Sequence, residues 1–224
     1  MSDQVLAGCI EHTVLAEDAN KAAILEGCEV VQEHGCPALV VAPRWVALAR
    51  KHLPPETDLV TVIGWPDGAN PSRLKLNEAA EAVAAGATHL DVVVNGARVV
   101  LGAFPAVSGE LRALRNACPN VTVKLIVESA ARSEMELIQL VAATAIGGAQ
   151  WLKTSTGRHP AGGATPEAVR LLHELGAPYG LRVKASGGIR SAEAALAMLE
   201  AGAERIGTSH TEAILSSVRA LPRS

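Results

Sequence analysis

Three lysines and an aspartate in this sequence have the residue types and spacing that carbonyl chemistry needs. Lys124, Lys153 and Lys184 each lie in a short β-branched segment, Asp91 lies in a fourth, and the whole chain holds only six lysines. A lysine amine attacks a carbonyl carbon only when neutral, so its pKa must fall from about 10.4 to about 7 or 8. Burial and a neighbouring ammonium group both lower it. The cluster therefore predicts a Schiff-base lysine that is activated by a second lysine.

A metal-dependent route has less support in the sequence. The seven histidines are scattered, and none forms an H-x-x-x-H or similar ligand pair. The cysteines lack the paired spacing of a zinc site and are few for a disulfide scaffold, so we expect free thiols at Cys9, Cys28, Cys36 and Cys118. Because the protonated nitrogen of a Schiff base is itself an electron sink, no metal and no cofactor are expected.

The candidate residues belong to segments with the composition of strands. Eight segments are short and β-branched, at residues 9–12, 38–42, 59–64, 89–94, 121–127, 151–155, 182–186 and 205–208. Residues two apart in a strand share a face. Polar residues recur at one parity of the later strands, at His89, Asp91, Asn95, Thr122, Lys124, Glu128, Lys153, Ser155, Lys184 and Ser186. We expect these side chains to face the inside of the sheet.

Helix signals alternate with the strand segments. Helix starts are predicted at Ser133, which forms a capping box with Glu136, at Thr165 before Pro166, and at Ser191. Helix ends are marked by Gly35, Gly86, Gly148, Gly176 and Gly202. Eight repeats of strand and helix predict an α/β fold, a single-domain (β/α)8 barrel over residues 1–224, with a doubly wound open sheet as the alternative.

Glycine-rich segments follow the last two predicted strands. These are "SGGIRS" at 186–191 and "GTSHT" at 207–211. In barrels, the loops after the seventh and eighth strands commonly bind a phosphate at a helix N-terminus, where backbone N–H groups point at the anion. A tight turn into a helix would also explain Gly187 and Gly188 alone. The two segments together favour a phosphate site.

Composition excludes several other classes of function. A net charge of −3 and 2% aromatic residues offer neither a basic surface for a nucleic-acid backbone nor rings that stack on bases. The longest uncharged run, 137–152, is interrupted by polar residues and is shorter than the ~20 apolar residues that span a bilayer. The first residues have no basic-then-apolar secretory pattern. We expect a soluble, cytoplasmic protein that binds neither nucleic acid nor membrane.

Beyond these physical arguments, the sequence resembles the deoxyribose-phosphate aldolases in their compact bacterial form. The resemblance runs over nearly the whole chain, through "IEHTVL" (10–15), "VIGWPDGAN" (62–70), "HLDVVVNGA" (89–97), "VKLIVES" (123–129), "LKTSTG" (152–157), "GGAT" (162–165), "VKASGGIR" (183–190) and "RIGTS" (205–209). It implies a class I aldolase that reversibly cleaves 2-deoxy-D-ribose 5-phosphate to D-glyceraldehyde 3-phosphate and acetaldehyde. It also implies a homodimer or higher homo-oligomer.

The resemblance assigns roles residue by residue. It makes Lys153 the Schiff-base lysine, Lys184 the lysine that depresses its pKa, and Asp91 the acid/base residue. The substrate-binding residues that it implies are Glu11, Thr13, Lys124, Thr154, Gly157, Gly187, Gly188, Arg190, Gly207, Thr208 and Ser209. Glu128 is implied as a supporting residue inside the barrel.

Four departures from the family's usual pattern qualify this reading. Glu11 stands where Asp is usual, Val40–Pro43 replaces Cys-Val-Asn-Pro, and the final "LPRS" lacks the tail tyrosine of some members. His210 and Thr211 replace Ser-Gly after "GTS". We therefore expect a weaker preference for phosphorylated sugar than is usual in the family.

Three other functions stay open on the sequence alone. A phosphosugar isomerase would use the same barrel but move protons without covalent attachment. A related Schiff-base aldolase could prefer unphosphorylated aldehydes. A non-catalytic sugar-phosphate-binding protein could keep the fold, but retention of both Lys153 and Lys184 argues against it.

Overall fold

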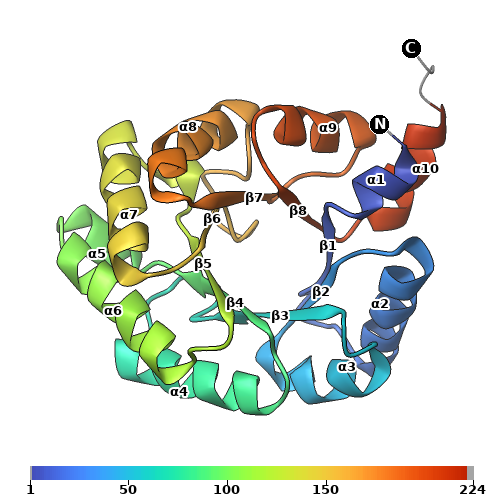
Figure 1. The fold of residues 1–224 in the computed structure, drawn as a ribbon, viewed down its shortest axis with the longest axis horizontal. Coiled ribbons are helices and arrows are strands. Elements are labelled where there is room, and N and C mark those ends of the chain that lie inside the picture. Colours follow the sequence, from blue (N-terminus) through green and yellow to red (C-terminus); the bar gives the residue numbers. More distant parts are fainter. Residues whose placement is uncertain (1, 221–224) are drawn as a thin grey trace.

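Eight parallel strands close into a barrel in the computed structural model, which describes residues 2–220 (Figure 1). The strands are β1 (Ile10–Val14), β2 (Ala38–Val41), β3 (Asp58–Ile63), β4 (His89–Val93), β5 (Thr122–Ile126), β6 (Trp151–Lys153), β7 (Arg182–Ser186) and β8 (Arg205–Thr208). Each pairs with the next in the chain, and β8 pairs with β1. This closure confirms the (β/α)8 barrel and excludes the open sheet.

Helices form a ring outside the strands (Figure 1). They are α1 (Asp3–Ala7), α2 (Lys21–His34), α3 (Val46–His52), α4 (Ser72–Ala84), α5 (Gly96–Val100), α6 (Phe104–Ala117), α7 (Glu134–Gly147), α8 (Pro166–Gly176), α9 (Ala192–Glu200) and α10 (Thr211–Ala220). Short 3-10 turns lie at Pro43–Trp45, Ser129–Ala131 and Ala177–Tyr179. The first and last helices, α1 and α10, lie side by side, so the two ends of the barrel chain meet.

The strand boundaries differ from expectation mainly at two places. The first strand runs two residues further than expected, to Val14, and the sixth ends at Lys153 instead of residue 155. The backbone N–H of Thr154 still donates to the carbonyl oxygen of Lys184 at 3.0 Å. Beyond it, a loop runs to Thr165 at the start of α8.

The predicted helix starts are confirmed. Ser133 accepts from the N–H of Glu136, whose carboxylate accepts from the N–H of Ser133, completing the capping box. Thr165 and Ser191 also cap their helices, because their side-chain oxygens accept from the N–H groups of Ala168 in α8 and Ala194 in α9. At the helix ends, Gly35 and Gly148 are left-handed, as this kind of C-cap requires. Gly176 instead keeps a helical φ, and a 3-10 turn follows it before the next strand.

Two apolar clusters hold the barrel together. The larger one lies between the outer face of the strands and the helices. The smaller one, Ala38, Val40 and Val60, fills the β2–β3 side of the barrel interior. The polar residues of β4 to β7 and β1 occupy the rest of the interior, which is where the candidate site begins.

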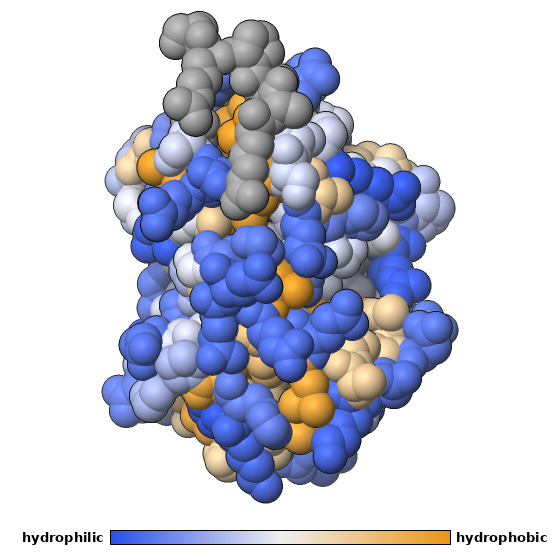
Figure 2. Space-filling model, turned by 90° about the vertical axis from the view of Figure 1, so that its right-hand side faces the viewer, coloured by the Kyte–Doolittle hydropathy of each residue, from blue (hydrophilic) through white to orange (hydrophobic). Residues whose placement is uncertain are grey.

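No helix within residues 2–220 is long and apolar enough to cross a membrane. Figure 2 shows a mainly hydrophilic surface on the side that carries α1, α2 and α10, with only scattered apolar residues between the polar ones.

Candidate active site

Strand register brings the four candidate residues together as two adjacent pairs. Lys153 of β6 lies opposite Lys184 of β7, and Asp91 of β4 lies opposite Lys124 of β5. Because residues of one parity point inward, adjacent partners in register bring their side chains together inside the barrel. The inward direction predicted for these residues is therefore the one that the structure has.

The inward side chains form one ionic cluster. Lys153 Nζ lies 2.9 Å from Asp91 Oδ2, and Lys184 Nζ lies 2.8 Å from the same oxygen. Lys124 Nζ lies 3.1 Å from Asp91 Oδ1 and 3.3 Å from Glu11 Oε1. Glu11 Oε2 completes the cluster by accepting a short hydrogen bond from Lys184. All five side chains are buried, so their mutual attraction must offset the loss of hydration.

The two lysines that face Asp91 Oδ2 differ in their ionisation. Burial lowers the pKa of Lys153 to about 8; Asp91 opposes this effect and Lys184 adds to it. Burial alone would also lower the pKa of Lys184, but Asp91 and Glu11 outweigh burial and raise it. At neutral pH, Lys184 stays an ammonium group, while a useful fraction of Lys153 is the neutral amine.

Both carboxylates of the cluster stay ionised. Burial alone would raise the pKa of Asp91, but Lys124, Lys153 and Lys184 together hold it well below the ordinary value. In the same way, Lys124 and Lys184 overcome burial and lower the pKa of Glu11 to about 2. In the free site, Asp91 is therefore an ionised hydrogen-bond acceptor directly beside the amine of Lys153.

A second layer closes the barrel interior below the cluster. The indole of Trp151 stacks on the Arg182 guanidinium, whose central carbon lies 4.1 Å from the ring centroid. His89 Nδ1 lies 3.1 Å from Lys124 Nζ, and His89 Nε2 lies 3.4 Å from Asp58. Burial and Lys124 lower the pKa of His89 to about 4, so the ring is a neutral acceptor for Lys124. Because this layer fills one end of the barrel interior, a small molecule would reach the ionic cluster from the opposite end.

That opposite end carries a cavity of about 560 Å³. Lys153 lies at its base, and its walls include most of the predicted binding residues: Thr13, Gly157, Gly187, Gly188, Arg190, Gly207, Thr208 and Ser209. The cavity lies at the carboxyl ends of the strands, where barrel enzymes have their active sites. Carbonyl attack by Lys153 is therefore possible from this side.

Two loops, those after β6 and β7, approach one another closely at the cavity wall because they carry glycine. A Cβ on Gly163 would lie 2.1 Å from the carbonyl oxygen of Gly187, and one on Gly187 would lie 3.2 Å from Gly157 Cα. Gly187 and Gly188 also have left-handed φ values, 90° and 81°. Backbone N–H groups can therefore be presented without side chains in front of them, as an anion site requires.

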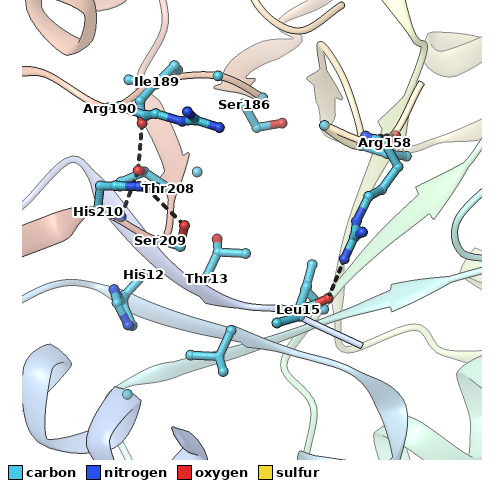
Figure 3. A pocket seen from close by; sticks show the side chains of 18 of the residues that line it. His12, Thr13, Leu15, Arg158, Ser186, Ile189, Arg190, Thr208, Ser209 and His210 are labelled. Carbon is cyan, nitrogen blue, oxygen red and sulfur yellow. Dashed lines mark hydrogen bonds between the residues drawn. The ribbon is translucent and has the colours of Figure 1, made fainter. Parts of the chain in front are cut away.

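The last segment of the wall leads into α10 (Figure 3). Thr208 Oγ1 donates to the carbonyl oxygen of Ile189 at 2.7 Å and accepts from the N–H of His210 at 3.0 Å. The His210 ring lies on the cavity wall, 3.1 Å from Ser209 Oγ. Thr211 points away from the cavity, because its hydroxyl lies 2.8 Å from His12 Nδ1 and its side chain is buried.

The remaining predicted residues lie behind the cavity wall. Thr154 is fully buried; its hydroxyl accepts from the N–H of Ser186 at 3.0 Å and donates to the carbonyl oxygen of the same residue at 3.1 Å. Glu128 has a left-handed φ of 56° and accepts from the N–H of Thr156 at 2.9 Å. Glu11, Lys124 and Asp91 lie in the ionic cluster below Lys153. The tail segment "LPRS" lies outside the described residues.

Among the wall residues that were not predicted, three carry a large polar or aromatic side chain and lie on or after the strands. His12 points outward from β1 and reaches the cavity beside α2; Trp65 follows β3; and Arg158 follows β6. Arg158 reaches across the mouth and donates to the carbonyl oxygen of Leu15 at 3.2 Å (Figure 3). The position of Trp65 and Arg158 just after strand ends is the one sequence signal that could have identified them.

The site combines a buried amine of lowered pKa with a glycine-lined cavity at the carboxyl ends of the strands. Within residues 2–220, no group of three or more His, Cys, Asp or Glu side chains is placed to hold a metal ion. A (β/α)8 barrel with such a cavity has the architecture of the barrel enzymes. The chain belongs to the DeoC/LacD family aldolases, whose family model matches residues 7–214.

Individual relatives cover nearly the whole chain. The deoxyribose-phosphate aldolase of Kocuria rhizophila is 43% identical over 95% of this chain and 96% of its own length. That of Mycobacterium tuberculosis is 39% identical over the same shares. The deoxyribose phosphate aldolase of Aeropyrum pernix, solved as a tetramer, is 34% identical, with a TM-score of 0.88 over 99% of this chain and 94% of that one.

Proposed function

We propose that this chain is a deoxyribose-phosphate aldolase, which cleaves 2-deoxy-D-ribose 5-phosphate to D-glyceraldehyde 3-phosphate and acetaldehyde and also runs the reverse addition. The observation that carries the proposal is Lys153, a lysine of pKa about 8 that lies at the base of the cavity, 2.9 Å from an ionised aspartate. The substrate is inferred from the relatives named above, and the amine of Lys153 is the group that would react with its carbonyl carbon.

The reaction divides among residues already described. The neutral amine of Lys153 adds to the C1 aldehyde of the open-chain sugar, and loss of water leaves a protonated imine. Removal of the proton from the C3 hydroxyl breaks the C2–C3 bond, and its electrons pass to the imine nitrogen, forming an enamine. A proton then returns to C2, and water releases acetaldehyde. Asp91, adjacent to Lys153 Nζ, exchanges these protons, and Lys184 keeps the site positively charged.

The phosphate would lie against the glycine-lined wall. Gly157, Gly187, Gly188, Gly207, Thr208 and Ser209 supply backbone and hydroxyl donors there, and Arg190 adds a charge. Ser191 and His210 precede the first turns of α9 and α10, so two helix N-termini face this wall. Thr13 lines the cavity between this wall and Lys153 and is a candidate contact for the sugar hydroxyls.

Trapping with borohydride tests the proposal against an isomerase. Reduction in the presence of acetaldehyde should leave a two-carbon secondary amine on Lys153, identified by peptide mass spectrometry. A phosphosugar isomerase leaves no adduct. A coupled assay with deoxyribose 5-phosphate and with plain deoxyribose then separates the proposed enzyme from an aldolase of unphosphorylated aldehydes. An adduct mainly on Lys124 or Lys184 would contradict the assignment of the nucleophile.

We further propose a homo-oligomer in the cytoplasm. Val100 and Leu101, at the end of α5, are 76% and 80% exposed, which is unusual for large apolar side chains. A solved relative is a tetramer. Light scattering on purified protein measures the assembly directly, and a monomer at micromolar concentration would contradict it.

A further inference from the structure

A fully buried lysine lies outside the catalytic cluster. Lys75 of α4 has an exposed fraction of 0%, and its Nζ donates to the carbonyl oxygen of Val93 at 2.7 Å and to Glu110 Oε1 at 2.9 Å. Val93 is the last residue of β4, two residues after Asp91 on the same strand. A buried ammonium group is costly unless such partners compensate it. Lys75 is therefore fixed at the carboxyl end of the strand that carries Asp91.

Glu110 extends this contact into a network. Its second oxygen, Oε2, accepts from Arg98 Nη1 at 2.9 Å and from Ser72 Oγ at 2.5 Å. Arg98 Nη2 also donates to Ser72 Oγ at 2.8 Å. The network joins α4, α5 and α6, and through Glu110 it fixes the position of the Lys75 ammonium group.

The methylene chain of Lys75 forms the floor under the loop that follows β3. A Cβ on Gly64 would lie 2.6 Å from Lys75 Cε, so the loop backbone rests directly on the lysine. The N–H of Gly64 donates to Glu78 Oε2 at 2.8 Å, and the N–H of Gly68 donates back to the carbonyl oxygen of Gly64 at 2.8 Å. On its other side, a Cβ on Gly68 would lie 2.2 Å from the carbonyl oxygen of Val94. The loop is clamped between Lys75 and the end of β4.

This loop carries Trp65, the residue after Gly64. Trp65 lines the cavity, and the centroid of its ring lies 6.0 Å from Lys153 Nζ. The aromatic face thus covers one side of the amine at the base of the cavity. Displacement of the loop would open that side of the amine to water.

We propose that Lys75, through its bonds to Glu110 and Val93, is a positioning residue that holds Trp65 over the amine of Lys153. Lys75 touches neither the substrate nor the reacting atoms; it acts through the backbone at Gly64. The proposal rests on the proposed function in one respect, since covering the amine affects the rate only if Lys153 is the nucleophile. Burial is the main cause of the lowered pKa of Lys153. If Trp65 no longer covers the amine, the amine should become more hydrated and its pKa should rise.

The test uses Lys75→Met/Glu110→Gln, which removes both charges of the buried pair together, so neither is left buried and unpaired. Arg98, whose side chain is 25% exposed, loses the carboxylate but keeps its bond to Ser72. The first readout is kcat/KM against pH for deoxyribose 5-phosphate cleavage. We expect kcat/KM to fall about tenfold at pH 7. The midpoint of the limb on which kcat/KM rises with pH should move up by about one unit, since each unit of pKa leaves about tenfold less neutral amine. The second readout is acrylamide quenching of Trp65 in a Trp45→Phe/Trp151→Phe background, which should increase.

The matched control is Leu111→Ala, a fully buried residue one position beyond Glu110 on α6 that faces α7 at Gly147. It lowers stability but should leave the pH midpoint and the Trp65 quenching unchanged. If the paired variant does not fold, Ser72→Ala, which removes one bond to Glu110 and one to Arg98, should increase the quenching by a smaller amount.

Two different failures can be distinguished. A paired variant with the wild-type pH midpoint and quenching, despite lower thermal stability, would overturn the role of Lys75. Wild-type protein that neither cleaves the sugar nor traps on Lys153 would overturn the proposed function instead. In that case the quenching comparison would still decide whether Lys75 positions Trp65.

Discussion

Lys153 and Lys184 donate to the same oxygen, Asp91 Oδ2, at 2.9 and 2.8 Å, yet only one of them is held as a strong cation. The difference lies in their other partners. Lys184 also donates to Glu11, so two carboxylates stabilise its charge. Within residues 2–220, Asp91 is the one carboxylate at ion-pair distance from Lys153, which lies at the base of the cavity. Asp91 and Glu11 together thus distinguish the proposed nucleophile, Lys153, from Lys184, which stays charged.

Replacement of Lys184 tests this division. Lys184→Leu removes the ammonium group that adds to burial in lowering the pKa of Lys153. We expect that pKa to rise, kcat/KM near pH 7 to fall by about 10- to 100-fold, and activity to recover partly at higher pH, at about tenfold per unit. The measurement is the pH profile of kcat/KM. An unchanged profile would mean that burial alone sets the nucleophile.

Replacement of Asp91 should separate imine formation from proton transfer. Asp91 opposes the lowering of the Lys153 pKa, so Asp91→Asn should leave the amine at least as neutral as before. Borohydride trapping should therefore survive while turnover falls by orders of magnitude. The variant should also lose about 3 to 5 kcal/mol of unfolding free energy, because Lys153 loses its ion-pair partner and Lys124 and Lys184 then keep only Glu11. Loss of trapping in protein that remains folded would assign Asp91 to assembly of the lysine site.

Much of the site could be predicted because strands impose a two-residue period. That period places Asp91, Lys124, Lys153 and Lys184 on the inside of the barrel without knowledge of any contact. The same reasoning fails once a strand ends. After Lys153, the chain turns at Gly157, with a φ of 78°, and no periodicity tells where Arg158 points. It reaches Leu15, more than a hundred residues earlier in the chain, which only tertiary packing brings near.

The sequence also could not predict the partner of a hydroxyl group that has two possible hydrogen bonds. A hydroxyl beside a catalytic lysine can face the cavity or bond to a neighbouring strand, and Thr154 bonds to Ser186. Thr211 can face the anion site or a buried ring, and it faces His12. In both cases the choice depends on which unpaired polar atom lies within reach in the folded barrel, a distance that residue type does not encode.

The position of Thr154 leads to a prediction that separates structure from binding. Thr154→Val keeps the shape but removes a hydroxyl that both accepts from and donates to Ser186. We expect the unfolding free energy to fall by about 1 to 3 kcal/mol, with KM changed by less than about twofold. Chemical denaturation and steady-state kinetics supply the two numbers. A large rise in KM at unchanged stability would favour the substrate contact that the family resemblance implies.

Lys153 itself should lower the free energy of unfolding at neutral pH. Its pKa is about 8 in the folded protein and 10.5 as the ordinary value, so below pH 8 the folded state holds a charged amine in an unfavourable site. Between those values the unfolded chain binds the proton and the folded one does not, so stability rises with pH in that window. The full difference is about 3 kcal/mol, at ~1.4 kcal/mol per unit.

Lys153→Met should accordingly be inactive but no less stable than wild type at pH 7. The wild type should gain on the variant as pH rises from 8 to 10.5, because only the wild type releases that proton on folding. Urea denaturation of both proteins at pH 7 and pH 10 measures the difference, and other titrating groups cancel between them. A variant several kcal/mol less stable at pH 7 would show that Lys153 mainly stabilises Asp91.

The last prediction concerns His210, where the chain departs from its family at the anion wall. Its ring lines the cavity beside Ser209, while its neighbour Thr211 is turned inward to His12. The two departures therefore differ in consequence, and only His210 can reach a bound phosphate. A bulky ring in place of a small hydroxyl should remove one direct contact, which is worth about 1.5 to 3 kcal/mol, or about 10- to 150-fold in affinity.

The preference for the phosphorylated sugar measures this effect. We expect the ratio of kcat/KM for deoxyribose 5-phosphate to that for plain deoxyribose to be lower in wild type than in His210→Ser. Because both sugars share the chemistry at the amine, the comparison of the two ratios isolates the ring. Thr211→Val, which removes only the hydroxyl that contacts His12, is the matched control and should behave as wild type. If His210→Ser has the wild-type ratio, His210 does not shape phosphate recognition; if Thr211→Val changes it instead, the effect passes through His12 and α10.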